Sequence, residues 1–101
     1  MISKAILTAL GGFLMFAGPV HAGDATAGKA KAEDCAGCHG DDGKGDAKNP
    51  GLAGMAELDF VKAMNEYKSG ARAKSKQMTK IAKGLSDDDI ANLAAYYATL
   101  H

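Results

Sequence analysis

Cys35-Ala36-Gly37-Cys38-His39 is the stretch of sequence that decides the fold, and it contains the only two cysteines of the chain. Cysteines three positions apart can bond to the two vinyl groups on one edge of a porphyrin. The histidine that follows then lies under the ring, where its imidazole can bind iron. The spacing therefore predicts one haem c, attached covalently through Cys35 and Cys38, with His39 as an axial ligand.

Three alternative kinds of site would use this pentapeptide less completely. A thioredoxin-like redox pair requires alternating strands and helices, and the sequence shows no convincing strand. A structural zinc site requires four ligands, but only His21, His39 and His101 accompany the thiols. A plain disulfide could stabilise a small exported domain, yet it leaves the histidine of the motif without a role.

The first 22 residues have the features of an export signal. Lys4 supplies a positive charge, residues 5–17 form an apolar run, and Val20-His21-Ala22 offers small residues where a signal peptidase cleaves. The run is short for a membrane span, which argues against an uncleaved anchor. We expect a cleaved signal peptide over residues 1–22 and a monohaem domain over residues 23–101, exported to the periplasm without stable membrane insertion.

The exported segment is short for a domain that must build an apolar core by itself, and a central haem would complete that core. The whole chain has 12 basic and 12 acidic residues, a balance that does not indicate a nucleic-acid-binding protein. Basic side chains gather between Lys62 and Lys83, which predicts a docking surface for a redox protein that donates or accepts electrons. We expect a monomer.

The exported segment predicts short helices separated by loops. Asp24 is a suitable N-cap for a first helix over residues 25–33, ending at the cysteine motif. Residues 40–54 are rich in glycine and Asp-Gly pairs, which predicts a long loop. In so small a domain a loop of this length needs a group to wrap, and the haem edge is the candidate.

Further helices are expected in the second half of the chain. Residues 56–69 predict a helix that ends at Gly70 and whose apolar residues recur at three- and four-residue spacing, namely Phe60, Val61, Met64 and Tyr67. Residues 78–83 predict a short helical turn after a lysine-rich link. Ser86 as N-cap, with a carboxylate three residues later, predicts a capping box and a final helix over residues 87–99.

The group on the second face of the iron decides whether a haem transfers electrons or binds small molecules. The exported segment offers Met55, Met64, Met78 and His101. Met64 belongs to an apolar helix face, Met55 to a loop-to-helix junction, and His101 to a chain end that would fray. Met78 stands in a polar stretch where an apolar side chain has no amphipathic role. We predict Met78 as the second axial ligand, which raises the reduction potential relative to two imidazoles.

Three blocks occur in order along the exported segment: Cys35-Ala36-Gly37-Cys38-His39-Gly40, then Asn49-Pro50-Gly51-Leu52-Ala53-Gly54, then Met78 followed by Leu85-Ser86-Asp87-Asp88-Asp89-Ile90 and Leu93-Ala94-Ala95-Tyr96-Tyr97. Together they resemble a class I c-type cytochrome of the short bacterial periplasmic kind. The resemblance implies an all-α cytochrome c fold, with three to five short helices wrapped around one haem. It also implies that the first and last helices cross near the cysteine motif, with Gly28 permitting their close approach.

The resemblance implies roles for individual residues as well. In the family, a proline carbonyl accepts a hydrogen bond from the non-ligating nitrogen of the haem histidine, and Pro50 matches that proline. An arginine ahead of the methionine neutralises a haem propionate, and Arg72 matches it, although a solvent-exposed arginine would look identical in sequence. The family commonly has an aromatic residue near the first-helix glycine. This chain has Lys31 and Ala32 there, so we expect Tyr97 to meet a smaller surface.

The function expected from these features is electron transfer rather than enzymatic catalysis. A six-coordinate His/Met haem predicts a soluble periplasmic carrier that cycles its iron between Fe(III) and Fe(II) and makes or breaks no bond. The alternative is a gas-binding or peroxide-reactive haem protein with a labile sixth ligand. The sequence offers no other obvious distal histidine or acid for that alternative.

Overall fold

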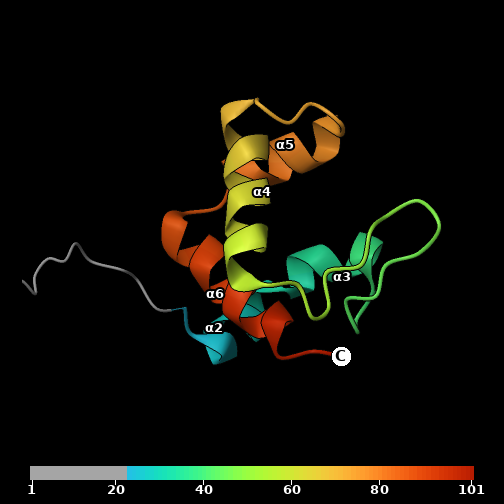
Figure 1. Cartoon of the computed structure of the whole chain (residues 1–101), viewed down its shortest axis with the longest axis vertical. Helices are drawn as coiled ribbons and strands as arrows, with labels where there is room; N and C mark the ends of the chain where they lie inside the picture. Colours follow the sequence, from blue (N-terminus) through green and yellow to red (C-terminus); the bar gives the residue numbers. More distant parts are fainter. Residues whose placement is uncertain (1–22) are drawn as a thin grey trace, which may run out of the picture.

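The computed structural model describes residues 23–101, and this part of the chain folds into five helices without a strand. The helices are α2 (Ala25–Lys31), α3 (Glu33–His39), α4 (Glu57–Ser69), α5 (Lys76–Lys83) and α6 (Asp87–Ala98). None of the described helices is long and apolar enough to cross a membrane. The all-α prediction is confirmed, whereas the predicted signal peptide over residues 1–22 lies outside the described residues (Figure 1).

The contact between α2 and α6 is the most extensive helix contact in the described chain. Gly28 is buried at this crossing, as expected, because it has no side chain to hold the two backbones apart. Asp24 caps α2 as predicted, and its side chain accepts hydrogen bonds from the backbone amides of Thr26 and Ala27. The backbone amide of Asp24 in turn donates to the side-chain oxygen of Asn92 on α6, at 2.8 Å.

The first helical segment differs from the prediction. The sequence predicts a single helix over residues 25–33 that ends at the cysteine motif, but the chain forms two helices divided at Ala32, and the motif itself is helical in α3. Ala32 is buried in the core, so the chain changes direction where α2 leaves α6. The change of direction carries α3 toward the opposite side of the molecule (Figure 1).

The core is formed mainly by α4 and α6, which lie against each other. Phe60 and Met64 of α4 are buried, while the other two members of its predicted stripe are partly exposed. The sequence predicts an apolar stripe of Ile90, Leu93, Ala94, Tyr97 and Leu100 on the last helix; the first four are buried on α6, whereas Leu100 lies beyond the end of the helix and is partly exposed. The rings of Phe60 and Tyr97 stack with their centroids 5.8 Å apart, which joins the two helices at the centre of the fold.

Hydrogen-bonding caps define α5 and α6. The capping box of α6 is confirmed, because Ser86 Oγ accepts from the Asp89 amide and the Asp89 carboxylate accepts from the Ser86 amide, both at 3.0 Å. The predicted start of α5 at residue 78 is wrong. Ser75 is an N-cap whose hydroxyl accepts from the backbone amide of Met78, so α5 begins at Lys76 and Met78 lies in its first turn.

The glycine-rich loop after α3 is held by its own backbone hydrogen bonds. The amide of Gly45 donates to the carbonyl of His39 at 2.7 Å, and the amide of Leu52 donates to Gly43 at 2.6 Å. The loop is tied to the core where Gly54 donates to the carbonyl of Tyr97, at 2.8 Å. These bonds fix the path of the loop beside α3.

Candidate haem site

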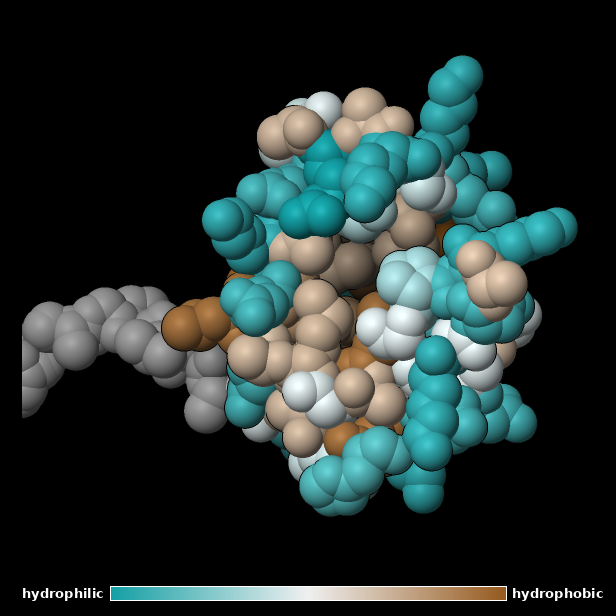
Figure 2. All heavy atoms as spheres, turned by 45° about the vertical axis from the view of Figure 1, so that its right-hand side comes forward, coloured by the Kyte–Doolittle hydropathy of each residue, from teal (hydrophilic) through white to brown (hydrophobic). Residues whose placement is uncertain are grey.

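A cavity of about 590 Å³ opens between the glycine-rich loop, α4 and the start of α5. Its wall includes side chains from each of these elements, among them His39, Leu52, Phe60, Met64, Tyr67 and Met78. The space-filling view of this side of the molecule shows a hollow with hydrophobic side chains at its floor and hydrophilic ones around its rim (Figure 2). An apolar floor of this kind limits the contact of water with a group that lies against it.

The two cysteines lie on α3 at one border of this region. Both are free thiols, with Cys35 partly buried and Cys38 exposed, and both line a narrow hollow together with His39 and Met78. Burial raises the pKa of the Cys35 thiol, and a hydrogen bond with Tyr97 acts in the opposite direction. Burial likewise raises the pKa of the Tyr97 phenol. Burial therefore favours the neutral form of the Cys35 thiol, and Cys38 is the more accessible of the two sulfurs.

The imidazole of His39 has one fixed hydrogen bond. The side chain is buried, and its Nδ1 atom lies 2.8 Å from the carbonyl oxygen of Pro50. A carbonyl only accepts, so Nδ1 carries the hydrogen and the lone pair of the ring is on Nε2. This is the hydrogen bond that the resemblance implied. It sets both the tautomer and the orientation of the ring toward the cavity.

The three candidate methionines all line the large cavity, but they differ in their surroundings. Met64 is buried in the core at 6% exposure, packed between helices. Met55 stands at the junction between the loop and α4 and does not line the narrow hollow that contains the cysteines. Met78, on α5, is partly buried and lines both spaces, as Met64 also does. His101 is exposed at the chain end, outside both linings.

Arg72 also lines the cavity, which separates it from a freely solvated surface arginine. Its guanidinium donates to one carboxylate oxygen of Glu66, from Nη2 at 2.6 Å and from Nε at 3.1 Å, and lies 5.5 Å from the centre of the Tyr67 ring. Sequence reasoning did not identify Glu66. No periodic pattern relates it to Arg72, because the two residues meet only where the chain reverses after α4.

The basic side chains between Lys62 and Lys83 are not all free at the surface. Lys68 is turned inward, where its Nζ donates to the backbone carbonyl of Leu85 at 2.5 Å, so it is removed from the predicted docking surface. Arg72 has an internal partner as well. The exposed lysines of the segment are Lys62, Lys74, Lys76, Lys80 and Lys83. The last three belong to α5, whose Met78 lines the cavity.

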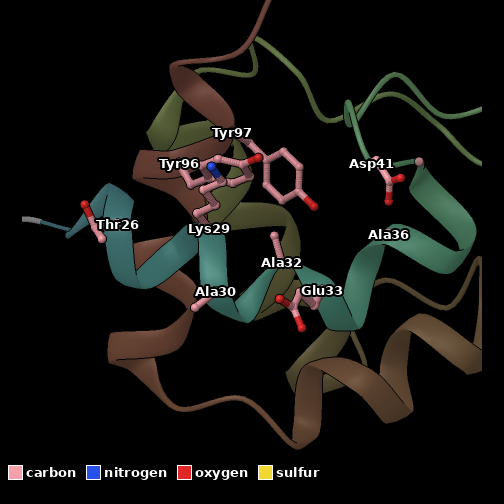
Figure 3. A pocket seen from close by; sticks show the side chains of 10 residues that line it. Thr26, Lys29, Ala30, Ala32, Glu33, Ala36, Asp41, Tyr96 and Tyr97 are labelled. Atoms are coloured by element: carbon pink, nitrogen blue, oxygen red, sulfur yellow. The ribbon is translucent and has the colours of Figure 1, made fainter.

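A second hollow, of about 380 Å³, lies between α2, α3 and the end of α6 (Figure 3). Ala30, Ala32 and Ala36 contribute small side chains to its wall; in this view Ala32 lies below the Tyr97 ring, whereas Ala30 lies apart from it. Ala32 and Tyr97 belong to the same buried cluster. Within residues 23–101, no group of three or more His, Cys, Asp or Glu side chains is placed so that it could hold a metal ion. A structural zinc site would require such a group.

Comparison with known proteins gives consistent matches. A model of the cytochrome c family matches residues 25–101. The chain is 48% identical over 79 residues to cytochrome c4 of Pseudomonas aeruginosa, a match that covers 77% of this chain and 39% of the relative. It is 43% identical over 81 residues to cytochrome c-554(548) of Halomonas halodenitrificans, covering 77% of this chain and 98% of the relative.

Solved structures show the same likeness. Reduced recombinant cytochrome c4 from Pseudomonas stutzeri matches with a TM-score of 0.70 and 36% identity, over 79% of this chain and 47% of that one. Thiosulfate dehydrogenase from Marichromatium purpuratum matches with a TM-score of 0.71 and 31% identity, over 75% of this chain and 18% of that one. The chain thus spans less than half the length of these solved relatives. The match of the family model over almost all of the described residues shows that this chain belongs to the cytochrome c family.

Proposed function

We propose that this protein is a soluble periplasmic electron carrier with one covalent haem c, in which residues 1–22 are removed on export and residues 23–101 form the working domain. The observation that supports this most directly is the set of donors around the narrow hollow that both cysteines line. Two free thiols, an imidazole with its Nε2 lone pair available, and a thioether all border it.

These donors fit the haem c that the family implies. Cys35 and Cys38 would hold the edge of the porphyrin, and His39 Nε2 with the sulfur of Met78 would ligate the iron. When bound, the haem supplies one-electron redox chemistry between Fe(III) and Fe(II). The chain itself would position the haem ligand and shield the ring: the Pro50 carbonyl orients the imidazole, and the apolar residues of the cavity limit contact with water.

Met78 is the proposed second ligand because its side chain is only partly buried, whereas that of Met64 is 6% exposed. Met64 is packed among buried side chains, and using it as a ligand would remove it from the contact between helices. Met78 instead lies in the short helix α5 with its backbone amide fixed by Ser75. Ligation by two side chains leaves no open iron position, which suits a carrier that transfers electrons without binding a substrate.

The experiment that tests this proposal is a near-infrared spectrum of the ferric protein. We expect a thioether-to-iron band near neutral pH in the wild type, in Met55→Ala and in Met64→Leu, and its loss in Met78→Ala. Persistence of the band in Met78→Ala would move the ligand to Met55 or Met64. A wild-type protein that lacks the band and changes its spectrum under carbon monoxide would instead support the gas-binding alternative.

The exposed lysines of α5 are proposed to form the docking surface for a redox partner. Lys76, Lys80 and Lys83 are exposed on the helix that also carries Met78 into the cavity wall. A partner with an acidic surface would be attracted to this side of the molecule, and electrostatic attraction acts chiefly on the rate of encounter. The proposed carrier is a monomer and not an enzyme.

A further inference from the structure

The side chain of Arg72 is held by Glu66. Glu66 Oε1 accepts from Nη2 and Nε of Arg72, and the Glu66 backbone carbonyl accepts from the Arg72 amide at 3.1 Å. Both side chains are about one-third exposed. Arg72 lines the large cavity and Glu66 does not. The cation is therefore part of the cavity wall, whereas its counter-ion is not.

The turn after α4 makes this pairing possible. Gly70 ends the helix with a φ of 88°, a conformation that favours glycine, and the chain then reverses. Ser69 Oγ donates to the Glu66 carbonyl at 3.2 Å and accepts from the Ala71 amide at 3.3 Å. Backbone and side-chain bonds thus converge on Glu66, and the guanidinium over the Tyr67 ring is restrained from a further direction.

The pairing leaves donors of the guanidinium unused. Arginine has five N–H donors, and Glu66 takes two of them, so three remain for a group inside the cavity. Arginine and carboxylates form short, charge-assisted hydrogen bonds, often two at once. A carboxylate is therefore the kind of group that these remaining donors would bind.

We propose that Glu66 is a positioning residue that acts through Arg72 and presents the free guanidinium donors to a haem propionate. This rests on the proposed haem site. Other charged or titratable groups of the cavity wall face the same space, namely His39, Asp46, Lys48, Tyr67 and Lys74. Lys48 and Lys74 are exposed, and neither lysine has the three restraints that hold Arg72. Arg72 is thus the pre-oriented cation of this wall.

Reduction potentials of the haem-loaded protein test the proposal through a double-mutant cycle. Wild type, Glu66→Gln, Arg72→Gln and the double variant are measured between pH 5 and pH 9. We expect Glu66→Gln to shift the reduction potential and also the pH at which the slope of potential against pH changes. Neither quantity should shift when Glu66→Gln is introduced into Arg72→Gln. Arg72→Gln alone should lower the potential, because a positive charge near the iron favours the reduced state.

Glu57→Gln is the matched control, since it removes the same charge from the first turn of the same helix. Equal shifts from Glu66→Gln in both backgrounds, or a shift no larger than that of Glu57→Gln, would overturn the positioning role. An Arg72→Gln protein with the wild-type reduction potential at every pH would also overturn the positioning role. The proposed function is tested separately, by the haem spectrum of the wild type, and would not be affected by that result. If Glu66→Gln fails to fold, Glu66→Asp replaces it in the cycle, with the same dependence on Arg72 expected.

Discussion

Gly28 and Asn92 meet backbone to backbone where α2 crosses α6. A β-carbon on Gly28 would lie 2.0 Å from the carbonyl oxygen of Asn92 and 2.6 Å from its carbonyl carbon, and neither atom belongs to a movable side chain. The two helices would have to separate to admit it. We expect Gly28→Ala to lower the free energy of unfolding of the ferric protein by about 1–3 kcal/mol, measured by guanidinium denaturation.

Gly37 provides the matched control within α3. A β-carbon there would have no heavy atom within 4 Å, and the residue lies inside a helix. Gly37→Ala should therefore raise the free energy of unfolding by about 0.4–1 kcal/mol, because alanine restricts the unfolded chain more than glycine does. If both variants lose the same free energy of unfolding, the close approach of the two helices is not the reason for a glycine at position 28.

Protonation of Asp89 in acid is expected to lower the free energy of unfolding. The hydrogen bond from the Ser86 backbone amide lowers the pKa of the Asp89 carboxyl below its ordinary value, with smaller contributions in the same direction from the Ser86 hydroxyl, Lys31 and Lys68. The folded chain thus favours the ionised form. Its stabilising effect is complete above the unfolded pKa, about 3.9, and is lost as the pH falls through the lower folded pKa.

Denaturation of the ferric wild type and Asp89→Asn at intervals between pH 6 and pH 2.5 measures this effect. The difference in free energy of unfolding between the two should narrow as the pH falls below about 4. Asp87→Asn is the control, since it leaves the reciprocal bonds between Ser86 and Asp89 intact. If the difference in free energy of unfolding between the wild type and Asp89→Asn stays constant across this pH range, ionisation of Asp89 does not contribute to stability.

The exposed lysines of α5 are expected to affect the rates at which small charged oxidants oxidise the ferrous protein. Replacing Lys76 and Lys80 by glutamine should slow oxidation of the ferrous protein by hexacyanoferrate(III), an anion, on the order of 3- to 10-fold at low ionic strength. Oxidation by a cationic cobalt phenanthroline complex should become faster. Stopped-flow spectroscopy measures both rates, and the differences should shrink in high salt.

Lys29→Gln is the control for this pair of rates and is compared with Lys80→Gln alone, so that each variant loses one positive charge; Lys29 lines the separate hollow between α2 and α6. It should change both rates by less than Lys80→Gln does. If Lys29→Gln has an equal effect, net charge rather than the local surface governs the reaction. Docking by α5 would then lose its support.

Elements governed by neighbouring residues were predictable. The stripe of α6, the cap at Asp24 and the box between Ser86 and Asp89 each depend on residues within two turns of one another. The N-cap at Ser75 is equally local, although the lysine-rich stretch around it masks its signal. The break at Ala32 was not predictable, because the residues around it are good helix formers and Ala32 itself keeps helical backbone angles, with φ −64° and ψ −13°.

The residues of the proposed donor set could be predicted from the sequence alone, from the spacing of Cys35, Cys38 and His39 and from the isolated position of Met78. The tertiary structure decided which charges face that site. It turns Lys68 away into a bond with a backbone carbonyl, and it brings Glu66 behind Arg72. The reason is physical: motif spacing and capping act between near neighbours, whereas the orientation of a long charged side chain depends on where the chain reverses and what packs beside it.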